Sequence, residues 1–364
     1  MAQKLFSEAT LGALTLANHI VMAPMTRNRA TADHNVTDIM ATYYAQRASA
    51  GLIITEGIAP SANGNGYARV PGLYTAAQVA GWKKVTEAVH AKGGRIFAQL
   101  MHSGRIGHPV NMHEGAEVIA PSAIAAGGQI YTDTDGMQDH PTPRALTTEE
   151  VKLVVQEFVQ AAKNAIEAGF DGVELHGANG YLIEQFLRSS SNQRTDEYGG
   201  SAENNARFAL EIAEAVSKAI GKDKTGIRLS PYGVFNDMPY SPADDEIYTY
   251  VADKLSDYVV YVHLVDHTSM GAPAVDPAIV EAIRATYEGA LILSGGYDAE
   301  RAEQALQSGQ ADLIAFGRPF IANPDLVDRL KEGAELAQPD FNTFYTPGEQ
   351  GYIDYPALEE LKAS

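Results

Sequence analysis

The sequence predicts a closed barrel of eight parallel β-strands, each followed by a helix. Eight short apolar runs alternate with helical patterns along the 364 residues, whereas an open sheet needs a reversal point and seldom contains eight such repeats. No shift in composition marks a linker, so we expect residues 1–364 to form a single domain. These observations favour the (β/α)8, or TIM-barrel, fold.

The expected strands are short runs of aliphatic residues bounded by glycine, proline and polar residues, as buried parallel strands are. The run from Gly172 to His176 is the clearest, because it lies between two long helical patterns. In chain order, the eight strands are expected at residues 19–24, 51–56, 95–101, 172–176, 226–231, 259–265, 290–295 and 313–317.

Helical patterns of apolar residues fall between these strands. The clearest helix start is at Thr147, whose residue type suits an N-cap, with Glu150 as its partner in a capping box. Gly169 and Gly221 are expected to end two long helices. The predicted helices include residues 76–92, 148–168, 202–220, 244–257, 299–308 and 324–331.

Three segments lie outside this alternation. Residues 5–17 carry two short alternating runs, and we expect a hairpin that closes the lower mouth of the barrel. Residues 102–145 form an unusually long connection after the third strand, which predicts a lid over the active-site face. Residues 339–355 contain several aromatic residues but no helical period. They either wrap back over the barrel or pack on its surface, and we favour surface packing.

The composition limits the partners of the protein. A formal net charge of -19 and a pI near 4.9 argue against nucleic acids and anionic membranes. No apolar run is long enough to span a bilayer, and the first residues lack a signal-peptide pattern. The absence of cysteine excludes a thiolate nucleophile and a Cys-ligated iron–sulfur cluster. We therefore expect a cytoplasmic enzyme for small molecules, either a monomer or a weak homo-oligomer.

Three polar side chains, His176, Asn179 and Tyr181, stand at and just after the end of the strand at 172–176. In parallel α/β folds, this edge of the sheet binds ligands. If the turn after the strand is helical, His176 and Asn179 share a face and bind one oxygen together, which stabilises developing negative charge. Tyr181 suits a general acid. A metal site is disfavoured by the spacing, whereas a core histidine satisfied by the backbone remains an alternative.

Two further polar side chains stand in otherwise apolar strands. Gln99 offers a hydrogen-bond donor and an acceptor at once, and Arg228 brings a charge into the barrel or just above it. A buried guanidinium needs an anionic or strongly accepting partner. That partner is either a ligand or a carboxylate of the barrel, for which Glu56 and Glu174 are the candidates.

Glycines and an arginine follow the last two strands, namely Gly295, Gly296, Gly317 and Arg318. Barrels often bind a phosphate there through backbone N–H groups, and an arginine adds a charge-assisted hydrogen bond. Alternatively, the glycines only turn the chain and the arginine pairs with a surface carboxylate. A flat heterocycle with an imide edge and a phosphate, such as flavin mononucleotide (FMN), would use these residues together with Gln99 and Arg228.

Six stretches resemble the Old Yellow Enzyme family of flavin-dependent ene-reductases, in particular the bacterial branch that includes pentaerythritol tetranitrate and N-ethylmaleimide reductases. The resemblance runs nearly end to end and in the expected order. The stretches are MAPMTR (22–27), FAQLMHSGR (97–105), HGANGY (176–181), NQRTDEYGGS (192–201), AFGRPFIANP (315–324) and GYIDYP (351–356).

The resemblance implies a TIM barrel that binds FMN non-covalently and receives hydride from NADPH or NADH. His176 and Asn179 would bind the oxygen of an activated alkene, and Tyr181 would protonate its carbon. The expected substrates are enones, enals, maleimides, nitroalkenes and nitro esters, reduced with ping-pong kinetics. By the matching motifs, Thr26 would tune the flavin, the cofactor would be bound by Pro24, Met25, Thr26, Gly57, Gln99, Arg228, Gly295, Gly296, Gly317 and Arg318, and the pocket would be lined by Tyr67, Met101 and Tyr345.

Two positions distinguish this chain within the resemblance. Met101 stands where the family often has tryptophan, which predicts a roomier pocket. Thr26 stands where another branch has cysteine, which favours the threonine-type branch. The competing hypotheses are a phosphate-binding TIM-barrel lyase or aldolase without flavin, and a non-catalytic flavin- or phenol-binding protein. An aldolase of this kind needs a Schiff-base lysine at a strand end, and the expected strands contain no lysine.

Overall fold

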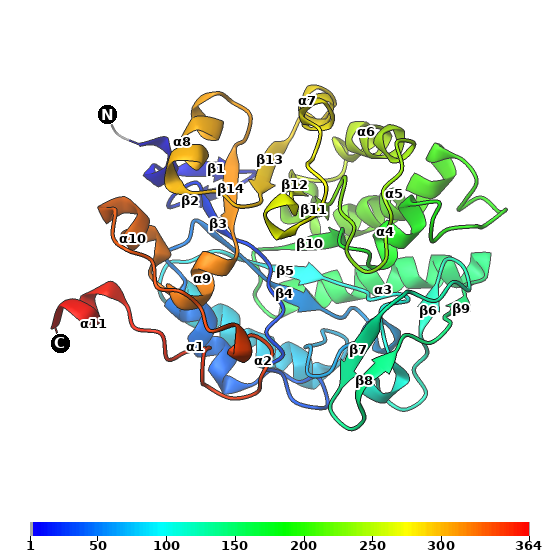
Figure 1. Cartoon of the computed structure of the whole chain (residues 1–364), viewed down its shortest axis with the longest axis horizontal. Coiled ribbons are helices and arrows are strands. Elements are labelled where there is room, and N and C mark those ends of the chain that lie inside the picture. Colours follow the sequence, from blue (N-terminus) through cyan, green and yellow to red (C-terminus); the bar gives the residue numbers. More distant parts are fainter. Residues whose placement is uncertain (1–2, 364) are drawn as a thin grey trace.

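The computed structural model describes residues 3–363 and contains a closed eight-stranded barrel (Figure 1). Neighbouring strands are parallel, in the order β10-β11-β12-β13-β14-β3-β4-β5. The predicted fold class is confirmed. The eight strands lie where they were predicted, and they are β3 (Ile20–Met22), β4 (Leu52–Ile58), β5 (Ile96–Leu100), β10 (Gly172–Gly177), β11 (Thr225–Leu229), β12 (Tyr261–Val265), β13 (Ala290–Ser294) and β14 (Leu313–Phe316).

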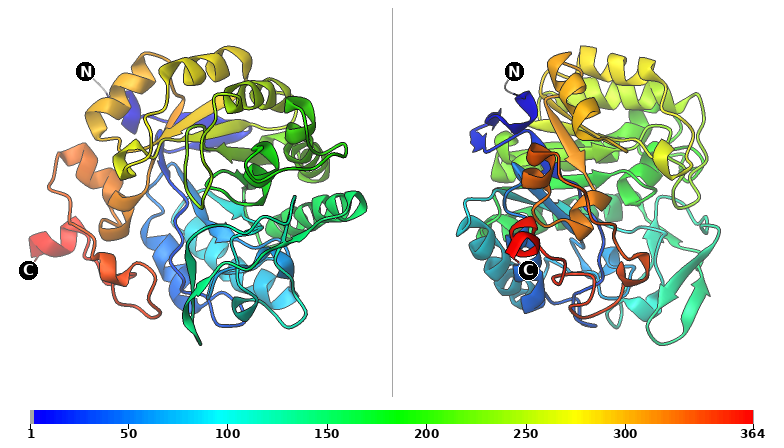
Figure 2. Two further views of the ribbon diagram at one scale, coloured as in Figure 1. Left: turned by 45° about the vertical axis from the view of Figure 1, so that its right-hand side comes forward. Right: turned by 60° about the vertical axis from the view of Figure 1, so that its left-hand side comes forward.

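Helices surround the barrel (Figure 2). The predicted capping box is present, because the Thr147 side chain accepts a hydrogen bond from the Glu150 N–H and Glu150 accepts one from the Thr147 N–H. No helix within residues 3–363 combines the length and apolarity needed to cross a membrane. The helices are α1 (Asp38–Gln46), α2 (Ala76–His90), α3 (Thr148–Glu167), α4 (Leu182–Leu187), α5 (Ala202–Ile220), α6 (Asp244–Leu255), α7 (Pro277–Thr286), α8 (Ala299–Gln307), α9 (Arg318–Ala322), α10 (Leu326–Glu332) and α11 (Leu358–Ala363).

The N-terminal hairpin closes one end of the barrel, as predicted. Its strands β1 (Ala9–Leu11) and β2 (Leu14–Leu16) are antiparallel. Leu11 and Leu16 are buried in one apolar cluster with Leu52 and Leu313, which are the first residues of β4 and β14. Burial of this apolar surface stabilises the hairpin on the amino ends of the strands. The carboxyl ends are left for ligand binding.

Residues 102–145 are folded into short elements. A parallel bridge joins β6 (Ile119–Ala120) to β9 (Arg144–Ala145), and β7 (Gln129–Thr132) forms a hairpin with β8 (Gly136–Asp139). Arg69, in the connection between β4 and α2, pairs with Asp133 of the hairpin turn and donates to the Tyr345 carbonyl (3.0 Å). The hairpin turn and the C-terminal tail therefore meet beside the same connection. The role of this segment as a lid stays a prediction.

The C-terminal tail wraps back onto the barrel, so the expectation of surface packing was wrong. Tyr352 is fully buried and stacks on Tyr43 of α1, with ring centroids 4.0 Å apart. Arg27 donates hydrogen bonds to the carbonyls of Phe344 (3.0 Å) and Gly351 (2.7 Å). Because Arg27 continues the segment that leaves β3, the tail fixes the backbone beside the predicted cofactor site.

Candidate active site

A layer of polar side chains crosses the barrel near the carboxyl ends of β10, β11 and β12. His176 lies opposite Arg228 in the strand register, and Arg228 lies opposite His263 on the next strand. Alternate residues of a strand face the same side, so Glu174 shares a face with His176, and it lies opposite Gln99 on β5. All five side chains are buried. Such groups are rarely buried without partners.

Glu174 is the centre of this layer. Gln99 Nε2 donates to Glu174 Oε1 (2.8 Å), while Tyr261 OH and His263 Nδ1 lie 3.0 and 2.9 Å from Oε2. Burial alone would raise the pKa of Glu174, but His263 and Arg228 stabilise the carboxylate, and the net shift of its pKa is downward. The contact with Glu174 leaves the Gln99 amide oxygen and one N–H hydrogen for another partner.

Arg228 forms neither of the two salt bridges considered from the sequence. Glu174 pairs with His263, and Glu56 accepts a hydrogen bond from Tyr44 OH (2.9 Å). Arg228 Nε is buried and has no hydrogen-bond partner among residues 3–363. Burial lowers the pKa of Arg228, and the Glu174 carboxylate opposes that shift. A buried guanidinium without a paired acceptor is unfavourable unless a ligand supplies one. This unpaired donor therefore points to a bound group.

His176 and Asn179 are joined by a turn, so the expectation of a shared helical face was wrong. Asn179 has a φ of 59°, and α4 begins only at Leu182. His176 Nδ1 accepts a hydrogen bond from the Ala178 N–H (3.3 Å), which leaves the ring proton on Nε2. Burial, together with repulsion from Arg228, holds the pKa of His176 well below its usual value. The ring is therefore a neutral N–H donor.

Tyr181 lies beside His176, with ring centroids 4.9 Å apart, and its hydroxyl is 3.1 Å from that of Tyr67. Burial raises the pKa of Tyr181, and hydrogen bonds from Tyr67 and Asn236 only partly offset that shift. The phenol therefore keeps its proton at neutral pH. It can transfer the proton to a stronger base that forms in the site.

The loops after β11 and β12 contribute residues that were not assigned from the sequence. Ser230 Oγ accepts from the Asn179 N–H (2.9 Å) and donates to Glu184 Oε1 (2.8 Å). Asn236 Nδ2 donates to the Asn179 carbonyl (2.7 Å), and His267 Nε2 lies 2.7 Å from Asn179 Oδ1. Because loop residues carry no periodic pattern, nothing in the sequence marked Asn236 or His267.

The predicted phosphate-binding residues lie at the ends of β13 and β14. Gly295 and Gly296 follow β13, and a side chain at position 295 would bring its Cβ to 2.3 Å from the Asp266 carbonyl oxygen. Only glycine allows this close approach. Gly317 precedes α9, and Arg318 is exposed, with its guanidinium over an aromatic ring. The three glycines and Arg318 thus place backbone groups and one cationic side chain at the ends of neighbouring strands.

The opposite side of the site is formed by segments that follow β3, β4 and β5. The β4 ladder is irregular between Ile54 and Gly57, and a Cβ at position 57 would lie 2.5 Å from Met101 Sδ. Met101 is 2% exposed, whereas Tyr345 is 59% exposed at the rim beside Arg69. Three half-buried residues lie in the segment after β3, namely Pro24, Met25 and Thr26.

FMN fits the donors and acceptors of this end of the barrel. Arg228 Nε needs an accepting edge, and the Gln99 amide still offers both an acceptor and a donor. The glycine backbones and the exposed Arg318 suit a phosphate. Within residues 3–363, no group of three or more His, Cys, Asp or Glu side chains is placed to hold a metal ion.

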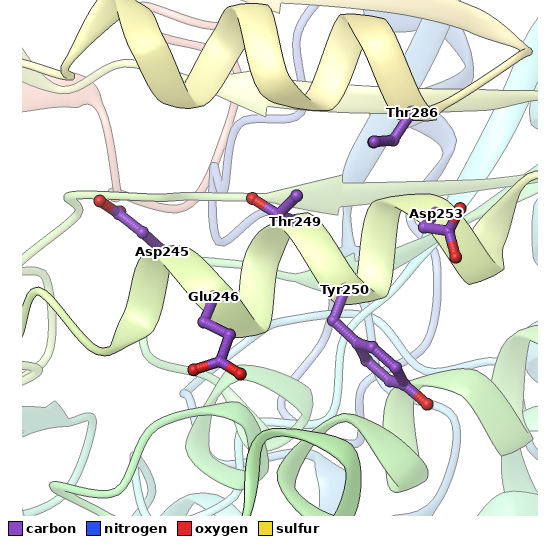
Figure 3. Close-up of a pocket in the computed structure, with 6 residues that line it drawn as sticks. All are labelled: Asp245, Glu246, Thr249, Tyr250, Asp253 and Thr286. Atoms are coloured by element: carbon purple, nitrogen blue, oxygen red, sulfur yellow. The ribbon is translucent and has the colours of Figure 1, made fainter.

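A surface groove of about 540 Å³ lies apart from this site, between α6 and α7 (Figure 3). It contains none of the residues at the carboxyl ends of the barrel strands, and its acidic lining does not suit the phosphate of a cofactor. The groove is lined by Asp245, Glu246, Thr249, Tyr250, Asp253 and Thr286.

A family model described as the NADH:flavin oxidoreductase / NADH oxidase family matches residues 4–337. The chain belongs to this family. The resemblance predicted from the sequence motifs is confirmed, and this membership removes the aldolase alternative.

Members of this family match nearly the whole chain. A probable flavin mononucleotide-dependent alkene reductase from Leishmania infantum is 45% identical and covers 96% of each chain. Morphinone reductase superposes with a TM-score of 0.94 at 43% identity, over 99% of this chain and 97% of that one. An Old Yellow Enzyme homologue from Zymomonas mobilis has the same TM-score, 0.94, and the same identity, 43%, over 98% and 100% of the two chains. The chain is an FMN-dependent ene-reductase with a nicotinamide hydride donor.

Proposed function

We propose that this ene-reductase binds enones, enals, maleimides, nitroalkenes and nitro esters at His176, Asn179 and Tyr181. One observation carries the proposal. An unpaired buried donor at Arg228, a neutral imidazole N–H at His176 and a protonated phenol at Tyr181 lie at the same end of the barrel. The Arg228 donor suits a cofactor, the His176 N–H suits a substrate oxygen, and the Tyr181 phenol suits a substrate carbon. We infer that the cofactor is held by Pro24, Met25, Thr26, Gly57, Gln99, Arg228, Gly295, Gly296, Gly317 and Arg318.

The side chains of this chain prepare the alkene for reduction. FMN bound at this end of the barrel would supply the hydride chemistry, from the nicotinamide donor to the alkene. His176 Nε2–H and the Asn179 amide donate hydrogen bonds to the carbonyl or nitro oxygen, where negative charge develops. Because both donors are fixed before the reaction, they stabilise this charge without reorganising. Loss of one such donor typically costs about 100- to 1000-fold in rate.

Tyr181 completes the reduction by giving its proton to the carbon next to the activating group. The raised pKa keeps the phenol protonated in the resting site. After transfer, the phenolate oxygen accepts a hydrogen bond from Tyr67 OH, which lies 3.1 Å away, and Arg228 offsets its charge. General-acid catalysis of this kind contributes about 100- to 10,000-fold.

We further infer that the nicotinamide and the alkene occupy the site in turn. The structure of morphinone reductase in complex with tetrahydroNAD, which matches with a TM-score of 0.92 at 44% identity, supports nicotinamide binding by a chain of this fold. Double-reciprocal plots at several NADPH or NADH concentrations should be parallel. Lines that intersect would argue for a ternary complex.

An absorption spectrum tests the proposed function most directly. The purified protein should show a flavin band that bleaches anaerobically with NADPH or NADH and returns when 2-cyclohexenone is added. A band that bleaches but returns with none of the five alkene classes would remove the proposed substrates. A protein that stays colourless after addition of FMN would remove the cofactor site itself.

A further inference from the structure

We propose that His267 is a positioning residue that holds the Asn179 side-chain amide with its NH2 group toward the substrate oxygen. The inference rests on the proposed function of Asn179 as a hydrogen-bond donor. His267 lies two residues beyond β12, and its Nε2 is 2.7 Å from Asn179 Oδ1. The contact joins two loops that are far apart in the sequence.

The backbone of Asn179 is fixed independently of His267. Its N–H donates to Ser230 Oγ (2.9 Å), and its carbonyl accepts from Asn236 Nδ2 (2.7 Å). Its φ of 59° is an unusual conformation for a residue other than glycine. What the backbone does not determine is which end of the side-chain amide faces the substrate. An amide can present either an acceptor oxygen or a donor NH2 group.

His267 decides between these two orientations. A carbonyl or nitro oxygen carries no hydrogen, so it can be bound only by the NH2 end of the Asn179 amide. This orientation turns Oδ1 toward His267, where an Nε2–H donor satisfies it. The reversed amide would place Asn179 Oδ1 against the substrate oxygen, and neither oxygen carries a hydrogen to donate. The productive arrangement therefore requires the tautomer of His267 that carries its proton on Nε2.

The surroundings of His267 keep it in the neutral form. The ring packs against Phe235, with centroids 4.5 Å apart. Burial, reinforced by repulsion from the Arg228 guanidinium, lowers the pKa of His267 to about 4, while Asp266 acts in the opposite direction. At neutral pH the ring has a single N–H, and the Asn179 oxygen is an acceptor within reach of it.

A double-mutant cycle tests this role. Holoenzyme is reduced anaerobically, and the second-order rate constant for re-oxidation by 2-cyclohexenone is measured. His267→Phe keeps an aromatic ring but removes the donor, and it should lower this constant about tenfold, as expected for loss of one hydrogen bond. His267→Gln provides an N–H again and should restore most of the lost rate. In an Asn179→Leu background, His267→Phe should have no further effect.

The outcomes separate this inference from the proposed function. Equal losses from His267→Phe in both backgrounds would show that His267 acts on the fold and not through Asn179. An unchanged rate in His267→Phe would also overturn the inference. Failure of the wild-type reduced holoenzyme to react with any of the proposed alkenes would instead remove the proposed function.

A spectroscopic measurement tests the tautomer without relying on turnover. Long-range ¹H–¹⁵N spectra of holoenzyme labelled with ¹⁵N-histidine distinguish a protonated Nε2 from a protonated Nδ1. The His267 signals are assigned by their absence from the spectrum of His267→Gln. We expect a protonated Nε2 and a bare Nδ1 at pH 7. The opposite tautomer would overturn the inference, because Nε2 could not then donate to Asn179.

Discussion

Arg228 links the stability of the barrel to the binding of its cofactor. Its side chain is 6% exposed, and its Nε has no partner among the described residues. In the absence of a ligand, such a group costs free energy, because desolvation of the charge is not offset by a paired acceptor. The residue is therefore expected to favour the FMN-bound protein over the FMN-free one.

Arg228→Met should leave the FMN-free protein as stable as the wild type, or more stable by up to about 2 kcal/mol. The same substitution should weaken FMN binding at least about tenfold, since a charged hydrogen bond is worth about 1.5–3 kcal/mol. Urea unfolding of the FMN-free proteins and fluorescence titration with FMN measure the two effects. Arg318→Met is the matched control, because this exposed residue should affect FMN affinity alone. A strongly destabilised FMN-free Arg228→Met would show a structural cation instead.

Tyr181→Phe tests the proton donor at the same scale. Removal of the hydroxyl should slow re-oxidation of the reduced enzyme by an enone about 100- to 10,000-fold. Reduction of the flavin by NADPH or NADH should change little, since it requires no proton from Tyr181. Stopped-flow absorbance separates the two half-reactions. Tyr67→Phe removes the neighbouring hydroxyl, 3.1 Å away, and should have a much smaller effect. Rapid re-oxidation of the reduced Tyr181→Phe enzyme by the enone would contradict the role of Tyr181 as proton donor.

The sequence marked some of these residues and not others, for a physical reason. Gln99 and Arg228 were visible because each interrupts an apolar strand whose period is known. His263 breaks its strand in the same way and was overlooked, although it pairs with Glu174. Asn236 and His267 lie on loops, where position depends on distant contacts. We predicted that His176 and Asn179 share the face of a helical turn, and this turn geometry was wrong. The φ of 59° at Asn179 leaves no recognisable pattern in the sequence.

At the scale of elements, the barrel strands were predictable and the tail was not. Short aliphatic runs identify buried parallel strands from local composition alone. The tail at residues 339–355 is held by contacts of another kind, because Arg27 and Arg29 donate to its backbone carbonyls over more than 300 positions of sequence. Any residue supplies a backbone carbonyl, so its sequence gives no sign of such contacts.

Tyr352→Ala tests how far the tail stabilises the protein. The ring is fully buried and stacks on Tyr43. Its removal should lower the free energy of unfolding by roughly 3 kcal/mol, the usual effect of truncating a large buried side chain. Phe341→Ala is the control in the same segment, because this ring is 62% exposed and its loss should cost well under 1 kcal/mol. Equal stabilities of the two variants, measured by urea denaturation, would contradict a stabilising role of the tail.

At the scale of the whole molecule, buried histidines link stability to pH. Burial lowers the pKa of His102 to about 3 and that of His267 to about 4, and it holds His176 well below its usual value. In the unfolded chain these groups bind protons from about pH 6.5 downward. The unfolded state then binds more protons than the folded state, so the folded state loses stability as the pH falls.

Glu56 acts in the opposite direction. Burial raises its pKa to about 7, so the folded state takes up a proton between pH 7 and 5.5 that the unfolded state does not. This uptake stabilises the fold by about 1.5 kcal/mol over that interval. Each histidine that stays neutral in the fold costs about 1 kcal/mol over the same interval. The three histidines outweigh Glu56, and these four groups together lower the free energy of unfolding by about 1–2 kcal/mol between pH 7 and 5.5.

Urea denaturation of the FMN-saturated protein at pH 7 and at pH 5.5 measures this loss. His102→Asn identifies its source, because His102 is buried, has no assigned role in the reaction and uses only Nδ1, which accepts from the Gly104 N–H (3.1 Å). The asparagine oxygen can accept the same bond without titrating. The free energy of unfolding of the variant should therefore fall by about 1 kcal/mol less between pH 7 and 5.5 than that of the wild type. A stability that is constant or rises between pH 7 and 5.5 would mean that these histidines become protonated in the folded state, and a charged His176 could no longer act as the neutral donor proposed for the site.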